Sequence, residues 1–341
     1  MPLTCQLIDN QQLWEQYVLS RPEANFLQSA NWAEFQQALG KKVFLIGVFD
    51  NQQQVGAMLA VKENAKRGNY LAIAGGPLLD WQQLTDQQLK EVFGYLKKLA
   101  KQERCLFVRF RPQALDTPEL RQKLSVLNIK ESPMHLTADL TLQLNLEQTP
   151  EEILNGMRKN TRYEVRKAEK EGITVITSSN PDDIKEFYEH QLELAAKHHF
   201  VPFSYEFLHE QFRIFAADNQ ALLISSYQNG KLLATAYVLF YNREAVYHYG
   251  ISTDTNDRLP GSYACQWAAI LEAQQRGCRV YNFWGIAPKE DTEHRFAGVS
   301  TFKRGFGGDE VAYLPAHDLP VSPLYKLTYW FEMLRKRSRH L

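Results

Sequence analysis

The feature that most constrains the fold is an order of predicted elements that occurs twice along the chain. The first half is predicted to contain a helix, two strands that form a hairpin, a second helix and a strand, at residues 32–39, 43–49, 55–62, 89–102 and 106–110. The second half repeats this order, with one added strand, at residues 184–198, 221–227, 231–241, 245–250, 263–276 and 280–284. Alternating helices and strands predict an α/β fold, and the repeated order predicts duplicated units, although no residue-level repeat is visible.

Length and composition indicate two globular domains. A chain of 341 residues is longer than one hydrophobic core usually serves. Its content of 44% hydrophobic and 23% charged residues is typical of folded protein. We place the boundary near Gln148-Thr149-Pro150, which gives a first domain over 1–147 and a second over 148–317.

Charge and cysteine usage exclude several classes of protein. Lys plus Arg and Asp plus Glu both number 39, so no global field attracts nucleic acid or anionic lipid, and such binding needs local patches. The four cysteines form no CxxC pair, which argues against a zinc site or a disulfide framework. The N-terminus shows no signal-peptide pattern, and no apolar run reaches membrane-spanning length. We therefore expect a cytoplasmic protein with reduced thiols, no metal and no cofactor.

A glycine-rich stretch near the C-terminus is the first candidate site. Residues 281–288 read Tyr-Asn-Phe-Trp-Gly-Ile-Ala-Pro and are predicted to form a strand followed by a loop. Residues 298–308, which read Gly-Val-Ser-Thr-Phe-Lys-Arg-Gly-Phe-Gly-Gly, are predicted to form a second strand. Lys303 in this setting can face an anion or a developing oxyanion. The alternative is a hairpin with a surface lysine, and Trp284 is either a core residue or a ligand platform.

A basic helix is the second candidate. A helix beginning near Glu151 and closed by Gly172 places Arg158, Arg162, Arg166 and Lys170 four residues apart on one face. This cationic stripe either contacts phosphates of tRNA or of a nucleotide-linked precursor, or it is a solvated face paired with nearby glutamates.

Three further segments allow more than one interpretation. On the strand over 245–250, Tyr247 and Tyr249 are predicted to face one side and His248, taken as structural, the other. Residues 258–263 partly match a pyrophosphate-binding loop through Arg258 and Gly261, but Tyr263 replaces the small residue that such loops carry, which weakens a coenzyme A interpretation. The C-terminal run either meets anionic lipid or is a packed helix with a basic tail. Its apolar and basic residues are Leu324, Leu327, Phe331, Leu334, Arg335, Lys336, Arg337 and Arg339.

Residues 157–172, 281–288 and 298–308 together resemble the Fem aminoacyl transferases, which form peptidoglycan bridges. Weaker matches at 25–32 and 75–80 extend the likeness over nearly the whole chain. The resemblance implies two tandem GNAT-like acyltransferase domains, with residues 318–341 returning to pack on the first. It also implies transfer of an amino acid from aminoacyl-tRNA to a free amine of a peptidoglycan precursor, with possible partners including the membrane surface.

The resemblance also suggests roles for single residues. Lys303 is expected to stabilise the oxyanion, Phe302 to shape the wall beside it, and Tyr249, Arg258 and Trp284 to contact substrate. It favours phosphate contact by Arg158, Arg162 and Arg166. The chain departs from the family in having Asn282 where many members have Asp, and in having no long two-helix insertion between 172 and 281. Two alternatives stay open, an acyl-CoA-dependent N-acyltransferase and a non-catalytic tRNA- or membrane-associated protein on the same fold.

Overall fold

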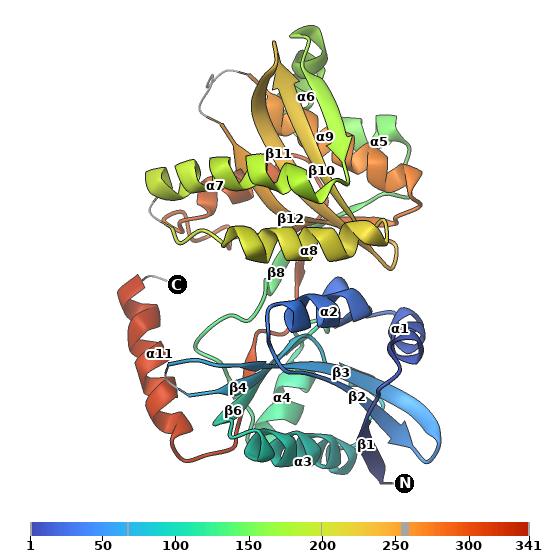
Figure 1. Cartoon of the computed structure of the whole chain (residues 1–341), viewed down its shortest axis with the longest axis vertical. Coiled ribbons are helices and arrows are strands. Elements are labelled where there is room, and N and C mark those ends of the chain that lie inside the picture. Colours follow the sequence, from blue (N-terminus) through green and yellow to red (C-terminus); the bar gives the residue numbers. More distant parts are fainter. Residues whose placement is uncertain (1, 67, 199, 254–258, 340–341) are drawn as a thin grey trace. The chain divides into compact units, whose positions relative to one another are not determined.

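The computed structural model describes residues 2–66, 68–198, 200–253 and 259–339. It divides into two compact units, Met1–Asp139 with Ala312–Leu341 (unit 1) and Leu140–Val311 (unit 2) (Figure 1). Both units are mixed α/β, as the sequence predicts. The division falls earlier than the predicted boundary near residue 148, because the strand Leu140–Asn145 hydrogen-bonds within the sheet of unit 2. Likewise, the return to unit 1 begins at Ala312, before the predicted residue 318.

Unit 1 contains one sheet in the order β1-β2-β3-β4-β6-β15-β7, with the short β5 paired to β3. Helices α1 and α2 lie on one face of this sheet, and α3 and α4 lie on the other. The elements are β1 (Leu3–Leu7), α1 (Gln11–Leu19), α2 (Ala30–Ala38), β2 (Val43–Asp50), β3 (Gln53–Glu63), β4 (Tyr70–Gly75), β5 (Leu78–Leu79), α3 (Asp86–Gln102), β6 (Phe107–Pro112), α4 (Pro118–Val126), β7 (Lys130–Glu131), β15 (His317–Pro320) and α11 (Tyr325–Arg339).

Unit 2 contains a second sheet, in the order β9-β10-β11-β12-β13-β8-β14. Helices α7 and α8 cover one face and α6 and α9 the other (Figure 1). The elements are β8 (Leu140–Asn145), α5 (Pro150–Gly156), α6 (Lys159–Lys170), β9 (Thr174–Ser178), α7 (Ile184–His198), α8 (Tyr205–Ala217), β10 (Ala221–Gln228), β11 (Lys231–Tyr241), β12 (Glu244–Ser252), α9 (Gly261–Gln275), β13 (Val280–Gly285), α10 (Ala297–Arg304) and β14 (Asp309–Ala312).

Local sequence signals account for several of these boundaries. Ser29 accepts a hydrogen bond from the Trp32 amide and caps α2, as predicted. Asn229 and Gly230, with φ of 50° and 73°, form the predicted tight turn between β10 and β11. Gly172, with φ of 68°, follows the last turn of α6, where a left-handed residue ends the helix.

The first five strands of the two sheets are arranged alike, in agreement with the duplication that the sequence pattern predicts, whereas the sixth strand is β15, the last strand of unit 1, in one sheet and β8, the first strand of unit 2, in the other. In each, four strands run antiparallel, the fourth pairs in parallel with the fifth, and an antiparallel strand follows. The parallel pairs differ in length. In unit 1, β4 and β6 stay paired from Tyr70 opposite Phe107 to Gly75 opposite Pro112. In unit 2, β12 and β13 stay paired only from Glu244 opposite Val280 to Val246 opposite Asn282. The parallel strands of unit 2 therefore separate early, and the separation exposes backbone for a site.

Candidate active site

The candidate site lies where β12 and β13 of unit 2 separate, and a β-bulge shapes it. On β11, Val238 pairs with Tyr247 and Tyr237 pairs with Tyr249, so His248 is an extra residue in β12. Because neighbouring residues of β11 face opposite sides of the sheet, Tyr247 and Tyr249 also face opposite sides. The prediction that they share a face was wrong, since the bulge breaks the two-residue period of the strand.

The first face of this site is aromatic and includes Tyr249 and Trp284, both predicted to contact substrate. The ring centroid of His248 lies 3.9 Å from that of Tyr249 and 5.9 Å from that of Trp284. Phe203, from the loop before α8, packs on Tyr249 at 4.9 Å. Each of these side chains is partly accessible. The arrangement forms a semi-exposed aromatic wall suited to stacking against a planar or apolar ligand group.

His248 is a neutral member of this wall. Burial lowers its pKa to about 3, so the imidazole carries no charge at neutral pH. Its Nε2 lies 3.2 Å from Nε2 of Gln211, a fully buried side chain of α8. This contact joins β12 to α8.

Trp284 is held in an unusual conformation by Asn282. Its φ of 62° lies in the left-handed region, which is rare for a bulky residue. The fully buried Asn282 accepts a hydrogen bond of 2.8 Å from the Trp284 amide and donates one of 2.8 Å to Glu244. The amide side chain thus joins β12 to the irregular end of β13. An amide at this position can accept from the Trp284 amide and donate to Glu244, whereas an ionised carboxylate can only accept.

Lys303 lies on a helix, α10, rather than on the predicted strand. The strand prediction was wrong, because the Ser300 amide donates to the Phe296 carbonyl, four residues earlier, at 2.8 Å. In addition, Ser300 and Thr301 direct their hydroxyls to carbonyls four residues earlier, at Phe296 and Ala297. Both features belong to a helix.

The ammonium of Lys303 is buried at the second face of the site. The residue is 7% exposed, its Nζ donates to the Gly285 carbonyl at 2.8 Å, and it lies 5.7 Å from the ring centroid of Tyr247. Burial lowers its pKa to about 8, so the protonated form prevails at neutral pH. Within the described chain, no carboxylate pairs with it. An ammonium has three N–H donors, and the hydrogen bond to Gly285 uses one of them.

Helix α10 also fixes the backbone that follows β13. The Ser300 hydroxyl accepts a hydrogen bond of 2.8 Å from the Ala287 amide, and Arg304 donates one of 2.6 Å to the Ala287 carbonyl. Arg304 is further paired with Glu310 at 2.7 Å. The loop that presents Gly285 to Lys303 is thus held at several points, which gives the ammonium a defined position.

Phe302 points away from the Lys303 ammonium, into the packing between α9 and α10. Its ring meets Tyr263 at 5.0 Å, and Tyr263 also stacks on Phe306 at 5.9 Å. The bulk of Tyr263 therefore fills the core at the start of α9. A Cβ on Gly261 would lie 2.4 Å from Leu233, so close packing on β11 accounts for this glycine. Arg258 lies outside the described residues.

The predicted cationic stripe spans two elements, since α5 ends at Gly156 and α6 begins at Lys159. Arg158 precedes α6, and its amide donates to the Gly305 carbonyl at the end of α10. Arg162 donates to the carbonyls of Asn155 and Met157 at 2.8 and 3.2 Å, which satisfies the end of α5. Arg166 and Lys170 are exposed. The continuous helix was a wrong prediction, because the chain changes direction at Met157, where ψ is 150°.

Comparisons with known proteins agree with this fold. The FemAB family matches residues 10–131, 128–227 and 217–333. Aminoacyltransferase FemA of Staphylococcus aureus is 24% identical, with 90% of this chain and 93% of that protein covered. A crystal structure of FemX superposes with a TM-score of 0.82 at 18% identity, covering 95% of this chain and 99% of that one.

A tandem GNAT protein from the clavulanic acid biosynthesis pathway superposes with a TM-score of 0.59 at 11% identity, covering 94% of this chain and 99% of that one. The fold is therefore a tandem GNAT fold, as the sequence predicts. Because the family match spans most of the chain, this protein belongs to the FemAB family.

Proposed function

We propose that this protein transfers an amino acid from aminoacyl-tRNA to a free amine on the stem peptide of a peptidoglycan precursor. Aminoacyl transfer is the activity named for its FemA relatives. The observation that carries the proposal for this chain is the buried ammonium of Lys303, which has no carboxylate partner among the described residues and lies at the separation of β12 and β13. An isolated buried cation is costly unless a ligand uses it.

The reaction needs little beyond positioning and one cation. The acceptor nitrogen attacks the ester carbonyl carbon, and negative charge develops on the carbonyl oxygen. Collapse of this intermediate breaks the bond to the ribose oxygen, which takes up a proton while the nitrogen loses one. Lys303 stabilises the oxygen in the transition state, and its hydrogen bond to Gly285 fixes its direction. The ester is already activated, so positioning supplies much of the remaining acceleration.

The surrounding residues have complementary roles in this proposal. Tyr249 and Trp284 contact the substrate through the aromatic wall, and Phe302 supports α10 from the core side. Arg158, which contacts α10, and Arg166, which is exposed on α6, meet phosphates, whereas Arg162 mainly secures the turn before α6. Arg258 is retained as a substrate-binding candidate from the sequence. Because aminoacyl-tRNA is a cytoplasmic donor, we place the protein in the cytoplasm, and a lipid-linked acceptor would bring it to the inner face of the membrane.

The acyl-CoA alternative is disfavoured by the start of α9. A pyrophosphate site needs several backbone amides within close reach, and there Tyr263 packs against Phe302 while Gly261 packs against Leu233. We expect no coenzyme A binding up to about 1 mM, which corresponds to a binding free energy weaker than roughly −4 kcal/mol.

The test uses purified protein with labelled aminoacyl-tRNA and a nucleotide-linked muropeptide that carries a free amine. Label is expected to move to the muropeptide only when both substrates are present, and acetyl-CoA is expected not to replace the tRNA. Acyl transfer from acetyl-CoA without tRNA would establish the alternative. If neither donor is consumed across the common aminoacyl-tRNAs, the proposed activity is wrong and a binding role replaces it.

A further inference from the structure

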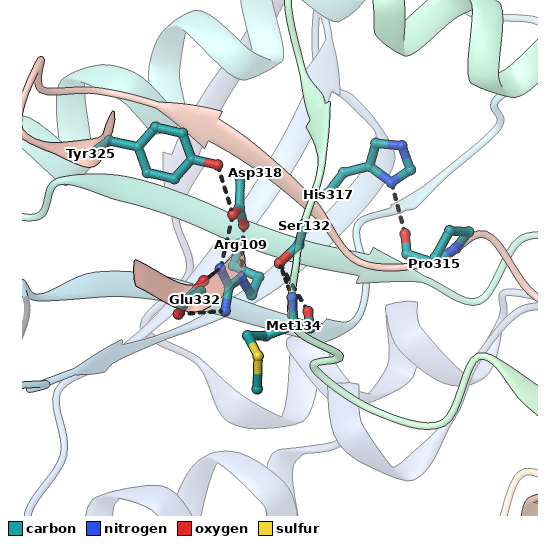
Figure 2. A network of polar contacts seen from close by, with 8 residues as sticks. All are labelled: Arg109, Ser132, Met134, Pro315, His317, Asp318, Tyr325 and Glu332. Atoms are coloured by element: carbon teal, nitrogen blue, oxygen red, sulfur yellow. Dashed lines mark hydrogen bonds and ion pairs between the residues drawn. The ribbon is translucent and has the colours of Figure 1, made fainter. Parts of the chain in front are cut away.

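The C-terminal helix α11 has one face committed to unit 1. Tyr325 and Thr328 are buried, and Tyr325 donates a hydrogen bond of 2.9 Å to Asp318 on β15. Glu332, which lies one turn after Thr328 and two turns after Tyr325, pairs with Arg109 of β6 at 2.6 Å. Figure 2 shows Asp318 and Glu332 on Arg109, which donates to both oxygens of Asp318, and Tyr325 on Asp318. The network fixes which side of the helix faces outward.

The outward side is apolar. Large side chains recur at three- and four-residue spacing along it, and all are exposed: Leu324 (56%), Leu327 (69%), Trp330 (68%), Phe331 (37%) and Leu334 (60%). Single exposed apolar residues are ordinary, but several on one helical face form a patch that marks an interaction surface. We call this set the outer face of α11.

The charges around the outer face have one sign. The helix carries one carboxylate, Glu332, and that group is turned inward to Arg109. Its other charged residues are all basic, and two of them, Lys326 and Arg335, flank the apolar side chains at about a quarter turn on either side of Leu327. An apolar face with an aromatic residue and basic flanks complements a surface that is apolar within and negatively charged at its boundary.

We propose that the outer face of α11 binds an anionic phospholipid bilayer, with the helix lying in the plane of the interface. Leu327 and Leu334 enter the boundary between headgroups and acyl chains, Trp330 lies at headgroup depth, and Lys326 and Arg335 meet lipid phosphates. Within the described part of the chain, no helix is both long and apolar enough to span a membrane. The surface belongs to unit 1 and does not depend on the proposed transferase activity.

Vesicle binding of the full-length protein tests this proposal. Co-sedimentation is expected with vesicles of equal parts phosphatidylglycerol and phosphatidylcholine, and it is expected to be weak with phosphatidylcholine alone. Leu327→Ser/Leu334→Ser should reduce binding to the anionic vesicles at least tenfold. Lys326→Glu/Arg335→Glu should reduce it roughly fivefold for each residue, and added salt should weaken binding of the parent protein.

Matched controls come from the same unit. Leu13→Ser/Leu115→Ser changes two leucines that are each 59% exposed, and Lys97→Glu/Lys98→Glu changes two exposed lysines of α3. Both control variants should bind as the parent does. Acyl-chain-brominated phosphatidylglycerol should quench part of the tryptophan fluorescence, and this part should be lost in Trp330→Phe.

Three results would overturn the proposal: no binding to anionic vesicles, equal loss in the control variants, or quenching that persists in Trp330→Phe. A concentration-dependent dimer without vesicles that Leu327→Ser/Leu334→Ser abolishes would instead assign the outer face to a second copy of the chain.

Discussion

The Lys303 ammonium donates to the carbonyl oxygen of Gly285 over 2.8 Å, in a position that is 7% exposed. This hydrogen bond directs the ammonium but leaves its charge unneutralised within the described residues. A purely structural lysine would be expected to reach solvent or a carboxylate. The pair therefore indicates a cation that the fold holds ready for a ligand, at a cost in stability.

That cost predicts a specific dependence of stability on pH. The folded-state pKa of Lys303, about 8, lies below its ordinary value of 10.5, so between these values the unfolded chain binds more protons. The free energy of unfolding of the parent should therefore rise between pH 8 and pH 10.5. Relative to Lys303→Met, which lacks the titrating group, the rise should reach about 3 kcal/mol. Urea unfolding of both proteins at pH 7.5 and pH 10 measures the difference. Parallel stability curves would show that the lysine is not desolvated.

The contact between Asn282 and Glu244 predicts that a loss of stability caused by a substitution at Asn282 can be rescued by a second substitution at Glu244. Asn282→Asp places two carboxylates at a buried hydrogen bond and should cost roughly 1–3 kcal/mol at neutral pH, less in acid. Adding Glu244→Gln restores a donor and an acceptor, so the double variant should recover most of the loss. A double-mutant cycle in urea gives the coupling. Additive losses would mean that the two side chains do not interact.

The basic residues near α10 should contribute unequally to tRNA binding. Arg166 is exposed, so Arg166→Gln should lower the slope of log K against log salt by about one and weaken binding. Arg162 already bonds two carbonyls, so Arg162→Gln should mainly reduce thermal stability. Lys97→Gln, on α3 of unit 1, is the control. An unchanged slope in Arg166→Gln would assign that residue to a solvated face.

The network around Arg109 should be a main source of stability for unit 1. Asp318 is fully buried and bonds both Arg109 and Tyr325, so Asp318→Asn should cost about 3–5 kcal/mol. Glu332 lies at the more exposed edge, and Glu332→Gln should cost about 1 kcal/mol. Urea midpoints of the two variants provide the comparison. Equal midpoints would contradict a buried anchor at Asp318.

Much of the fold was predictable because helix caps, turn residues and hydrophobic period are local signals. Ser29, Asn229-Gly230 and Gly172 each appear in their predicted roles. The duplication of the two units was also predictable, because it follows from the order of helices and strands along the chain. That order does not depend on any single residue.

The details of the site were harder to predict because tertiary contacts determine them. The bulge at His248, which reverses the face of Tyr249, depends on the pairing with β11 and leaves no mark in the sequence period. The segment of Lys303 mixes glycine, valine and aromatic residues, which are poor helix formers, so its sequence favoured a strand although the structure has helix α10 there. The role of Asn282 follows only from Glu244, a residue of the neighbouring strand.

Steady-state transfer by Lys303→Met is the most direct test of the central claim. The substitution keeps most of the side-chain length and removes the charge, so kcat should fall by roughly 10²- to 10³-fold, as loss of an oxyanion donor does. In the parent, kcat/KM should decline as pH rises through about 8, where Lys303 of the free enzyme loses its proton. Lys97→Met should behave as the parent does. A Lys303→Met enzyme whose kcat stays within about threefold of the parent would contradict the account.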